Sequence, residues 1–380
     1  MPSSFKCPGC AANLSFDADQ QMMTCEYCGA EISPEDLISK PEEESSETSK
    51  AGADSASMTQ EDIQGMSEEE LEEFETQSQE EYLDEDASQQ YICNSCGAEV
   101  VTDKNTAATF CAFCGSPTII TERVGQFRKP DYVIPFKYGK DKAIERFFQW
   151  CKAGRFTPLD FVKDSNIEKI TGLYVPFWLH NCKGIMAYNA EARTVNAVTT
   201  GRKTVTTTRY YNVVRNRELF WKLLPLDGSK DIDDHLMEVV EPFHFDQLVP
   251  FDMIYLAGFF ADKYDQTSDD VKKRLEARLT RYMDFLFKST TKHYTRVYNV
   301  SKKAEFSTPS VKYALLPIWF LSYTYLGKKH IFAMNGQTGK VAGEPPISIV
   351  KLLVLAMALL PVAAALVRLL IGGLILGGFF

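Results

Sequence analysis

Two segments of the chain repeat apolar side chains with the period of an α-helix. Residues 140–152 place four apolar side chains on one helical face: Ile144, Phe147, Phe148 and Cys151. Residues 268–288 carry a longer stripe of the same kind: Val271, Leu275, Leu279, Met283 and Leu286. Thr267 can cap this second segment, and Asp269 and Asp270 suit its first turn. The pattern therefore predicts two amphipathic helices.

Other segments have the composition of β-strands. Residues 174–178 form a short apolar run, and residues 185–217 predict a long hairpin that turns near Gly201. Residues 315–325 and 330–342 are expected to close the sheet, and the Asn335-Gly336 pair favours a tight turn. Together with the helices, these strands predict an α+β body over residues 122–345.

The body also shows signs of an internal duplication. The run LYVPFWL at 173–179 resembles LLPIWFL at 315–321, and an amphipathic helix precedes each. Residues 133–136 and 253–256 would then be the opening strands of two halves, 125–225 and 230–345.

The C-terminal segment is the most apolar part of the chain. Residues 352–380 carry a single charge, Arg368, and as a helix they would reach about 43 Å, more than the ~30 Å of a bilayer core. We expect a transmembrane helix within residues 349–380, single-pass or re-entrant because of Pro361 and the glycine pairs. A buried helix or an amphipathic surface helix is the alternative. Lys340, Lys351 and the lack of an export signal predict a cell-membrane protein whose bulk is cytoplasmic.

Charge is distributed unevenly along the chain. Residues 31–90 hold 21 acidic and 2 basic side chains, a net charge of −19, whereas the rest of the chain has a net charge of +9. This polar segment predicts a disordered linker over residues 33–89. It could be a simple spacer, or it could mimic phosphates and compete for the basic part of the same chain.

Eight of the ten cysteines form two modules with identical spacing, CxxC-x14-CxxC. The first module, within residues 1–32, contains Cys7, Cys10, Cys25 and Cys28; the second, within residues 90–121, contains Cys93, Cys96, Cys111 and Cys114. Two CxxC turns joined by a short hairpin form a tetrahedral set of thiolates, so we expect two Zn²⁺ ions. Four cysteine ligands leave no open position, which indicates a structural role; iron is the chemical alternative.

At these residues the chain resembles known zinc ribbons. CPGCAANLSFD with MMTCEYCGAEI, and YICNSCGAEVV with ATFCAFCGSPTII, are similar to the transcription-factor-IIB-type ribbon and to bacterial ribbons often labelled replication-restart-helicase-like. The body resembles an uncharacterised group of bacterial ribbon proteins with a membrane-anchored C-terminus. The resemblance implies a zinc-binding protein of hairpin ribbons, and the helicase label implies a link to DNA replication or transcription. The sequence lacks GxxxxGK[ST], so it has no ATPase motor of that kind.

No catalytic constellation is visible in the sequence. The five histidines share no metal-binding spacing, and there is no GxSxG or GxGxxG motif. Cys151 and Cys182 suit core positions better than nucleophilic ones. We therefore expect a protein that is not an enzyme, although an enzyme with an unrecognised motif is a third alternative.

The predicted hairpin is strongly basic. Residues 201–217 contain five cations and no acid: Arg202, Lys203, Arg209, Arg215 and Arg217. Such a hairpin can follow a phosphate backbone or lie against anionic lipid, and the alternative is an ordinary solvated strand face. The leading hypothesis is a membrane-anchored adaptor that presents its ribbons and basic body to a protein or nucleic-acid partner. The alternative is a nucleic-acid-binding protein of replication or transcription.

Overall fold

The computed structural model describes residues 5–38, 88–93, 95–103, 111–113, 119–122, 128–154, 156–158, 169–325 and 328–376. The predicted acidic linker lies outside the described residues, except for residues 33–38 and 88–89. Within the first of these, Pro34–Ile38 form the short helix α1.

An eleven-stranded sheet dominates the described structure, with the order β10-β7-β12-β8-β11-β5-β4-β6 and with β9, β13 and β14 attached at its side. Its three long strands are β8 (Thr171–Thr200), β9 (Lys203–Asp227) and β12 (Arg296–Tyr325). The shorter strands are β4 (Ser88–Cys93), β5 (Glu99–Asp103), β6 (Ile119–Glu122), β7 (Tyr132–Val133), β10 (Val249–Pro250), β11 (Phe260–Asp262), β13 (Lys328–Asn335) and β14 (Val341–Ala342). A separate sheet contains β1 (Ser15–Asp17), β2 (Met22–Thr24) and β3 (Glu31–Ile32).

Residues 173–179 of β8 form an unbroken apolar run because both faces of the strand are buried there. Tyr174 and Trp178 belong to one hydrophobic cluster, with α4 (Lys140–Ala153) and α7 (Lys272–Thr291). Phe177 belongs to a second cluster on the other face, with α6 (Asp234–Val240). A strand covered on both sides loses the apolar–polar alternation that would mark it in the sequence.

The two predicted amphipathic helices are confirmed as α4 and α7. Helix α7 begins at Lys272 rather than at 268, because a turn precedes it in which Asp270 accepts hydrogen bonds from Thr267. Residues 253–256, predicted as an opening strand, form the 3-10 helix η3 (Met253–Leu256) instead, whose Ile254 N–H donates to the Asp252 side chain. A second 3-10 helix, η2, covers Phe245–Gln247.

The predicted α+β body is wrong, since the body is mostly β-sheet with few helices. The strand predicted at 174–178 and the hairpin predicted at 185–217 form one continuous pair of long strands, β8 and β9. Residues 296–314, for which no strand was predicted, belong to β12. Their alternation is hidden by charged residues such as Lys302, Lys303 and Glu305, so they form no apolar run.

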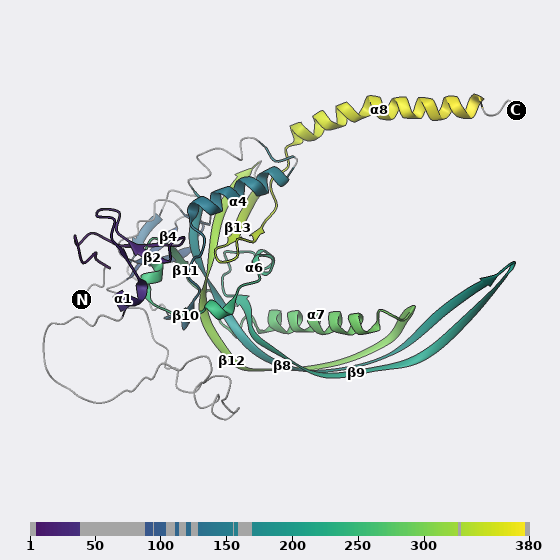
Figure 1. Ribbon diagram of the computed structural model, residues 1–380, viewed down its shortest axis with the longest axis horizontal. Helices are drawn as coiled ribbons and strands as arrows, with labels where there is room; N and C mark the ends of the chain where they lie inside the picture. The colour runs from purple at the N-terminus through teal and green to yellow at the C-terminus, as the bar shows by residue number, and fades with distance from the viewer. Residues whose placement is uncertain are drawn as a thin grey trace.

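The C-terminal helix α8 (Ile349–Leu376) extends away from the body in Figure 1. A helical crossing needs about 20 predominantly apolar residues in one helix. In the part of the chain that the structure describes, no helix is both long and apolar enough to meet that requirement. The predicted transmembrane segment within residues 349–380 is therefore not supported. The prediction of a cell-membrane localisation, which depended on that segment, is wrong for the same reason.

The order of a short strand, a helix and a long strand occurs twice, as β7-α4-β8 and as β11-α7-β12. Each short strand pairs in parallel with the long strand of the other set, β7 with β12 and β11 with β8. The two similar runs, 173–179 and 315–321, lie side by side in antiparallel register, with Leu173 opposite Ile318. The internal duplication itself stays a prediction.

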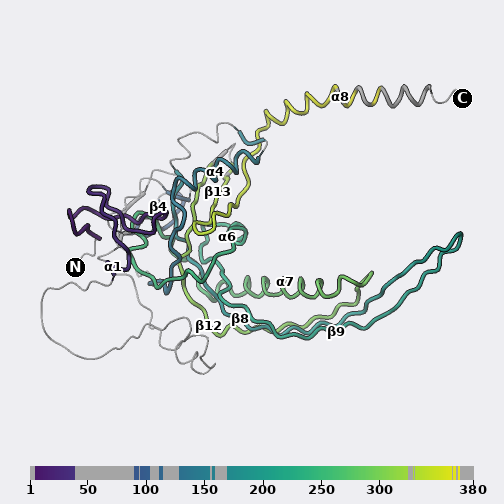
Figure 2. Tube along the Cα trace, viewed as in Figure 1, coloured from purple at the N-terminus to yellow at the C-terminus, as the bar shows by residue number. Residues whose placement is uncertain are grey.

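The β8–β9 hairpin projects from the body as an arm. Pairing of β12 with β8 ends at Arg296 and Arg193, so residues 194–209 form a two-stranded ribbon that no third strand joins. Figures 1 and 2 show this arm curving beyond the end of α7. The turn contains Gly201 at a φ of +62°, which agrees with the turn predicted near this residue.

Candidate metal centres and the basic arm

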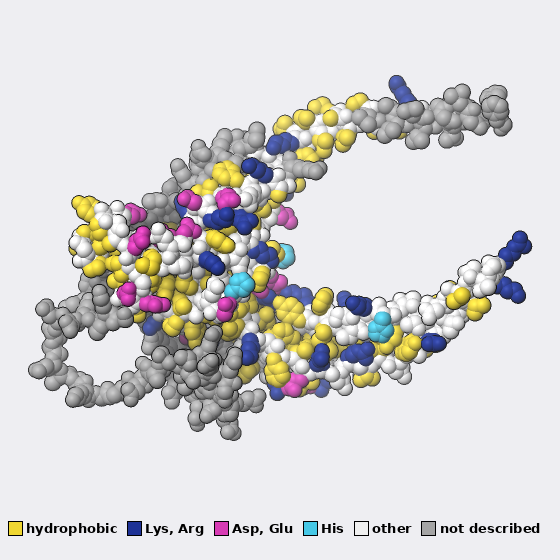
Figure 3. All heavy atoms as spheres, in the orientation of Figure 1, with side chains coloured by type: hydrophobic (Ala, Val, Ile, Leu, Met, Phe, Trp, Pro, Cys, Tyr) yellow, Lys and Arg dark blue, Asp and Glu magenta, His cyan; other side chains and the backbone are white. Residues whose placement is uncertain are grey.

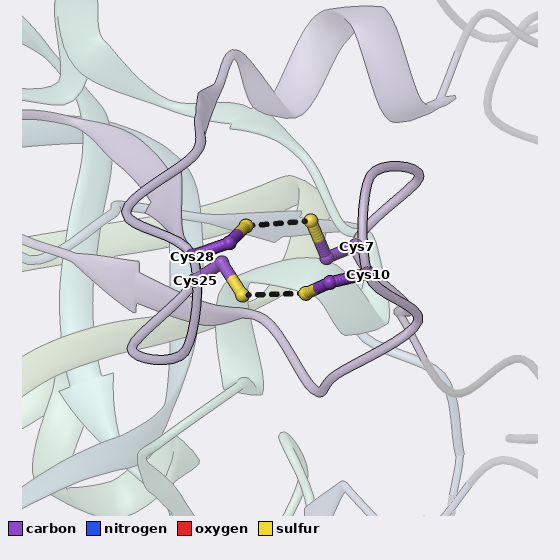
Figure 4. A group of neighbouring side chains, drawn as sticks. All are labelled: Cys7, Cys10, Cys25 and Cys28. Atoms are coloured by element: carbon purple, nitrogen blue, oxygen red, sulfur yellow. Dashed lines mark hydrogen bonds between the residues drawn. The ribbon is translucent and has the colours of Figure 1, made fainter.

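The first cysteine module brings four thiols together. Two turns, at residues 7–10 and 25–28, face each other across the site (Figure 4). The Sγ atoms of Cys7 and Cys28 lie 3.5 Å apart, and those of Cys10 and Cys25 lie 3.4 Å apart. These separations exceed the ~2.05 Å of a disulfide, and the four sulfurs all lie within 4.8 Å of one another. The group could hold a metal ion.

The two turns share one backbone geometry. The N–H of Ala11 donates to the Cys7 carbonyl, and the N–H of Gly29 donates to the Cys25 carbonyl, both at 2.8 Å. Ala11 and Gly29 occupy the same position after a CxxC pair and have positive φ values of 58° and 70°. Glycine is favoured in this conformation because it has no Cβ. Ala11 has a Cβ, and the hydrogen bond of the turn to the Cys7 carbonyl holds it in this conformation.

Backbone amides set the charge distribution among the thiols. The Cys28 N–H, together with that of Tyr27, lowers the pKa of Cys25 to about 7, and the Gly9 N–H lowers the pKa of Cys7. The Ala12 N–H also lowers the pKa of Cys10, but burial and the neighbouring sulfurs outweigh it and raise that pKa to about 12. Four sulfurs this close can all be thiolates only if a cation compensates their charge.

The first module is built into the body rather than separate from it. The Phe16 N–H donates to the Ala257 carbonyl, and Phe16 packs edge-on against Tyr255 with ring centroids 5.8 Å apart. The Gln21 amide donates to the Phe136 carbonyl at 2.6 Å. Asp19 accepts a hydrogen bond from the Gly139 N–H at the start of α4. Cys7 and Cys25 belong to the same buried cluster as Phe136.

The second cysteine module is also part of the main sheet. Cys93, Cys96 and Cys111 form a group that could hold a metal ion, with Sγ atoms of Cys96 and Cys111 3.7 Å apart. The predicted fourth ligand, Cys114, lies outside the described residues. Strand β5 pairs with β11 of the body, and the Phe113 ring lies 5.9 Å from the Phe320 ring.

The cross-strand register assigns the arm's cations to a face. Residues directly opposite in an antiparallel pair point to the same side of the sheet. Four basic residues of β9 pair with even-numbered residues of β8: Lys203 with Thr200, Arg209 with Thr194, Arg215 with Tyr188, and Arg217 with Met186. Tyr188 and Met186 are buried against α7, so these four cations lie on the side that α7 covers. We call them the cationic face; Arg202 lies in the turn.

None of the five predicted basic contact residues forms a salt bridge with another described residue. Arg215 donates only to the backbone carbonyl of Val214. Residues 196–212 of the arm are exposed. Charged side chains without internal partners are available to bind an anionic partner.

Sequence reasoning missed the basic residues of α7. Lys288 in α7 and Lys292 at its C-cap are exposed and follow Arg281 at spacings of seven and eleven residues, opposite the buried stripe that contains Met283. The signal was present, because cations that fall between the positions of an apolar stripe lie on its outer face.

The two remaining cysteines are core residues, as predicted. Cys151 and Cys182 are buried, and burial raises the pKa of Cys151 to about 12. A thiol in this environment is a poor nucleophile.

Comparison with known proteins gives one informative match. The chain is 32% identical, over 345 residues, to a protein of Bacillus subtilis (strain 168) described as "Uncharacterized protein YdjG". The aligned region covers 91% of this chain and 90% of that protein. No family model and no solved structure matches the chain.

Proposed function

Because the chain belongs to the same family as YdjG, whose own description is "uncharacterized", we propose a function from the residues of the chain itself. It is a non-catalytic binding protein in which two structural zinc centres complete the fold and the basic arm contacts a macromolecular partner. The proposal keeps the adaptor role expected from the sequence and leaves out the membrane anchor.

The thiol geometry supports zinc at the first centre. With Zn–S bonds of about 2.3 Å, a tetrahedral site separates its sulfurs by about 3.8 Å. The sulfurs here are 3.4 and 3.5 Å apart, so a small adjustment would accommodate the ion. Backbone N–H groups directed at the sulfurs also stabilise thiolate ligands. The second module has the same spacing in the sequence, and we propose that Cys114 completes its ligand set as a second zinc ribbon.

Elemental analysis of the full-length chain tests the zinc assignment. We expect two zinc ions per chain, and one after Cys28→Ser or Cys96→Ser, since each variant removes a ligand from one centre only. Iron in place of zinc, or fewer than two metal ions in fully loaded protein, would contradict it.

The exposed arm is the feature that most strongly supports the binding role. Its neighbouring hydrophobic cluster ends near Ala192 and Val213, so residues 194–209 contribute little to a core. A two-stranded ribbon exposed to water on both faces is marginally stable by itself, and here the long strands of the body extend it. A ribbon that projects without covering anything, and that carries unpaired cations, supports a binding role.

Shortening the arm tests this role for any class of partner. Replacing residues 197–206 by Asn-Gly leaves Asn196 and Thr207, a natural cross-strand pair, to flank a two-residue turn. We expect the shortened chain to keep the thermal melting of the intact protein but to lose the partner recovered by crosslinking in cells. Recovery of the same partner with the short arm would contradict the proposal.

A further inference from the structure

We propose that the partner is B-form duplex DNA, bound along one side of the long ribbon by the cationic face of the arm and the outer face of α7. This inference deepens the proposed binding function and depends on it. It rests on the faces to which the cross-strand register assigns the cations, on the position of α7, and on the lack of aromatic side chains on the cationic side of residues 203–209.

The two faces of the long ribbon differ in charge. On the cationic face, Lys203, Arg209, Arg215 and Arg217 are unpaired, and the acid Asp284 of α7 is already bonded to Lys302 and Tyr188. The opposite face carries three acids, Glu191, Glu218 and Glu305, beside four cations, Lys183, Arg193, Arg296 and Lys303. Two of these acids are paired there, Glu218 with Lys183 and Glu305 with Lys303. The cationic face has the larger positive charge, and a polyanion is therefore attracted more strongly to that side of the ribbon.

Helix α7 extends the positive surface along the same side. It packs on the sheet through Met283 and Phe287, so its opposite face points in the same direction as the cationic face. That outer face carries Lys288 and Lys292, both exposed and without a salt bridge to any described residue. Figure 3 shows Lys and Arg side chains on α7 and at the tip of the arm, along the same limb of the molecule. The cations of the arm and of α7 therefore lie on the same side of the ribbon, where one extended polyanion can contact both.

The composition of the arm also favours a duplex. Proteins that bind single strands stack successive bases on aromatic side chains. The cationic side of residues 203–209 has no aromatic residue, and the next one, Tyr211, packs against Tyr294 with ring centroids 5.2 Å apart. The major groove of B-DNA admits a two-stranded β-ribbon, which is the form of residues 194–209. The deep, narrow major groove of duplex RNA does not.

The length of the cationic face determines how long the DNA duplex used as a probe must be. Fourteen residue steps separate Lys203 from Arg217, which is about 46 Å at ~3.3 Å per residue. At one phosphate charge per ~1.7 Å, that length of duplex presents about 27 charges. A fluorescent 20-base-pair DNA duplex is long enough to cover the arm.

Binding of this duplex to the full-length chain is measured by fluorescence anisotropy from 0.05 to 0.5 M salt. We expect Lys203→Gln with Arg209→Gln to weaken binding about 60-fold at 0.1 M salt and to reduce the salt slope by about 1.8, since each lost phosphate contact contributes about 0.9. Lys288→Gln with Lys292→Gln should weaken binding to a similar extent. The control is Arg296→Gln with Lys303→Gln, which removes two cations from the opposite face of the sheet, one of them already paired with Glu305, and should change affinity less than about threefold.

Equal weakening by the control pair would overturn the assignment of the face. Tighter binding to a single strand, to duplex RNA or to anionic vesicles would overturn the choice of partner, as would a lack of binding to the DNA duplex. All substituted residues are exposed, and thermal melting verifies that each variant is folded. A protein partner that is lost on shortening the arm, together with no DNA binding, would reject this inference while leaving the proposed binding function intact.

Discussion

Docking of the first cysteine module onto the body predicts that a change inside the module destabilises the whole body. Phe16 is 6% exposed, packs against Tyr255 and belongs to the large buried cluster that contains Phe136. Truncating a buried phenylalanine to alanine costs about 3–5 kcal/mol, because it removes apolar burial and leaves a cavity. We expect Phe16→Ala to lower the free energy of unfolding of the body by this amount.

The four tryptophans of the chain provide the assay. Trp150, Trp178, Trp221 and Trp319 all lie outside the cysteine modules, so tryptophan fluorescence during urea unfolding follows the body. The matched control is Tyr27→Ala in the same module, where the side chain is 84% exposed and the expected change is within about 0.5 kcal/mol. A tryptophan transition that Phe16→Ala does not move would refute docking and would return the module to an independent domain.

Three further predictions concern α7, a buried histidine and the acidic segment. Arg278→Ala should lower the free energy of unfolding by about 3–5 kcal/mol, because it leaves the Glu241 carboxylate without its buried partner. The control is Arg281→Ala, whose side chain is exposed and which should lower the free energy of unfolding by less than about 1 kcal/mol. Equal losses in the two variants would contradict this prediction. Burial, with a contribution from Arg274, lowers the pKa of His180 from 6.5 to about 4. As the pH falls from 6.5 towards 4, the unfolded state therefore binds a proton before the folded state does, and stability is lost. Thermal melting of His180→Gln should show a smaller loss over this pH range, and a pH profile equal to that of the intact protein would contradict this. Deleting residues 41–87, which removes most of the net charge of −19 carried by residues 31–90, should tighten DNA binding at low salt if the segment competes for the cationic face, whereas unchanged affinity would make it a spacer.

The sequence predicted the features that depend on short-range spacing. The repeated CxxC spacing indicated the cysteine groups, and seven of those eight thiols are among the described clusters. The helical stripes of α4 and α7 were visible because each helix buries a single face. The hairpin turn at Gly201 was recognisable because glycine there lies between two strand-like segments.

Features that depend on long-range pairing were not predictable in this way. The first half of β12 has no apolar run and contains adjacent charged residues such as Lys302 and Lys303. Its strand structure comes from pairing with β8, a neighbour more than one hundred residues away in sequence. Docking of the first module depends on contacts such as Phe16 with Tyr255, which no local pattern encodes. The cationic face required the register, since a shift of one residue would move every cation of β9 to the other side.

A photo-crosslinking amino acid at two adjacent positions of the arm tests the account most directly. Thr207 lies opposite Asn196 and points to the cationic face, whereas Thr206 lies opposite Ala197 and points to the other face. Both side chains are exposed threonines, so the two variants differ only in direction. The account predicts that the crosslinker at position 207 captures the labelled DNA duplex and that the one at position 206 does not. Capture from position 206 alone, or from neither position, would contradict it.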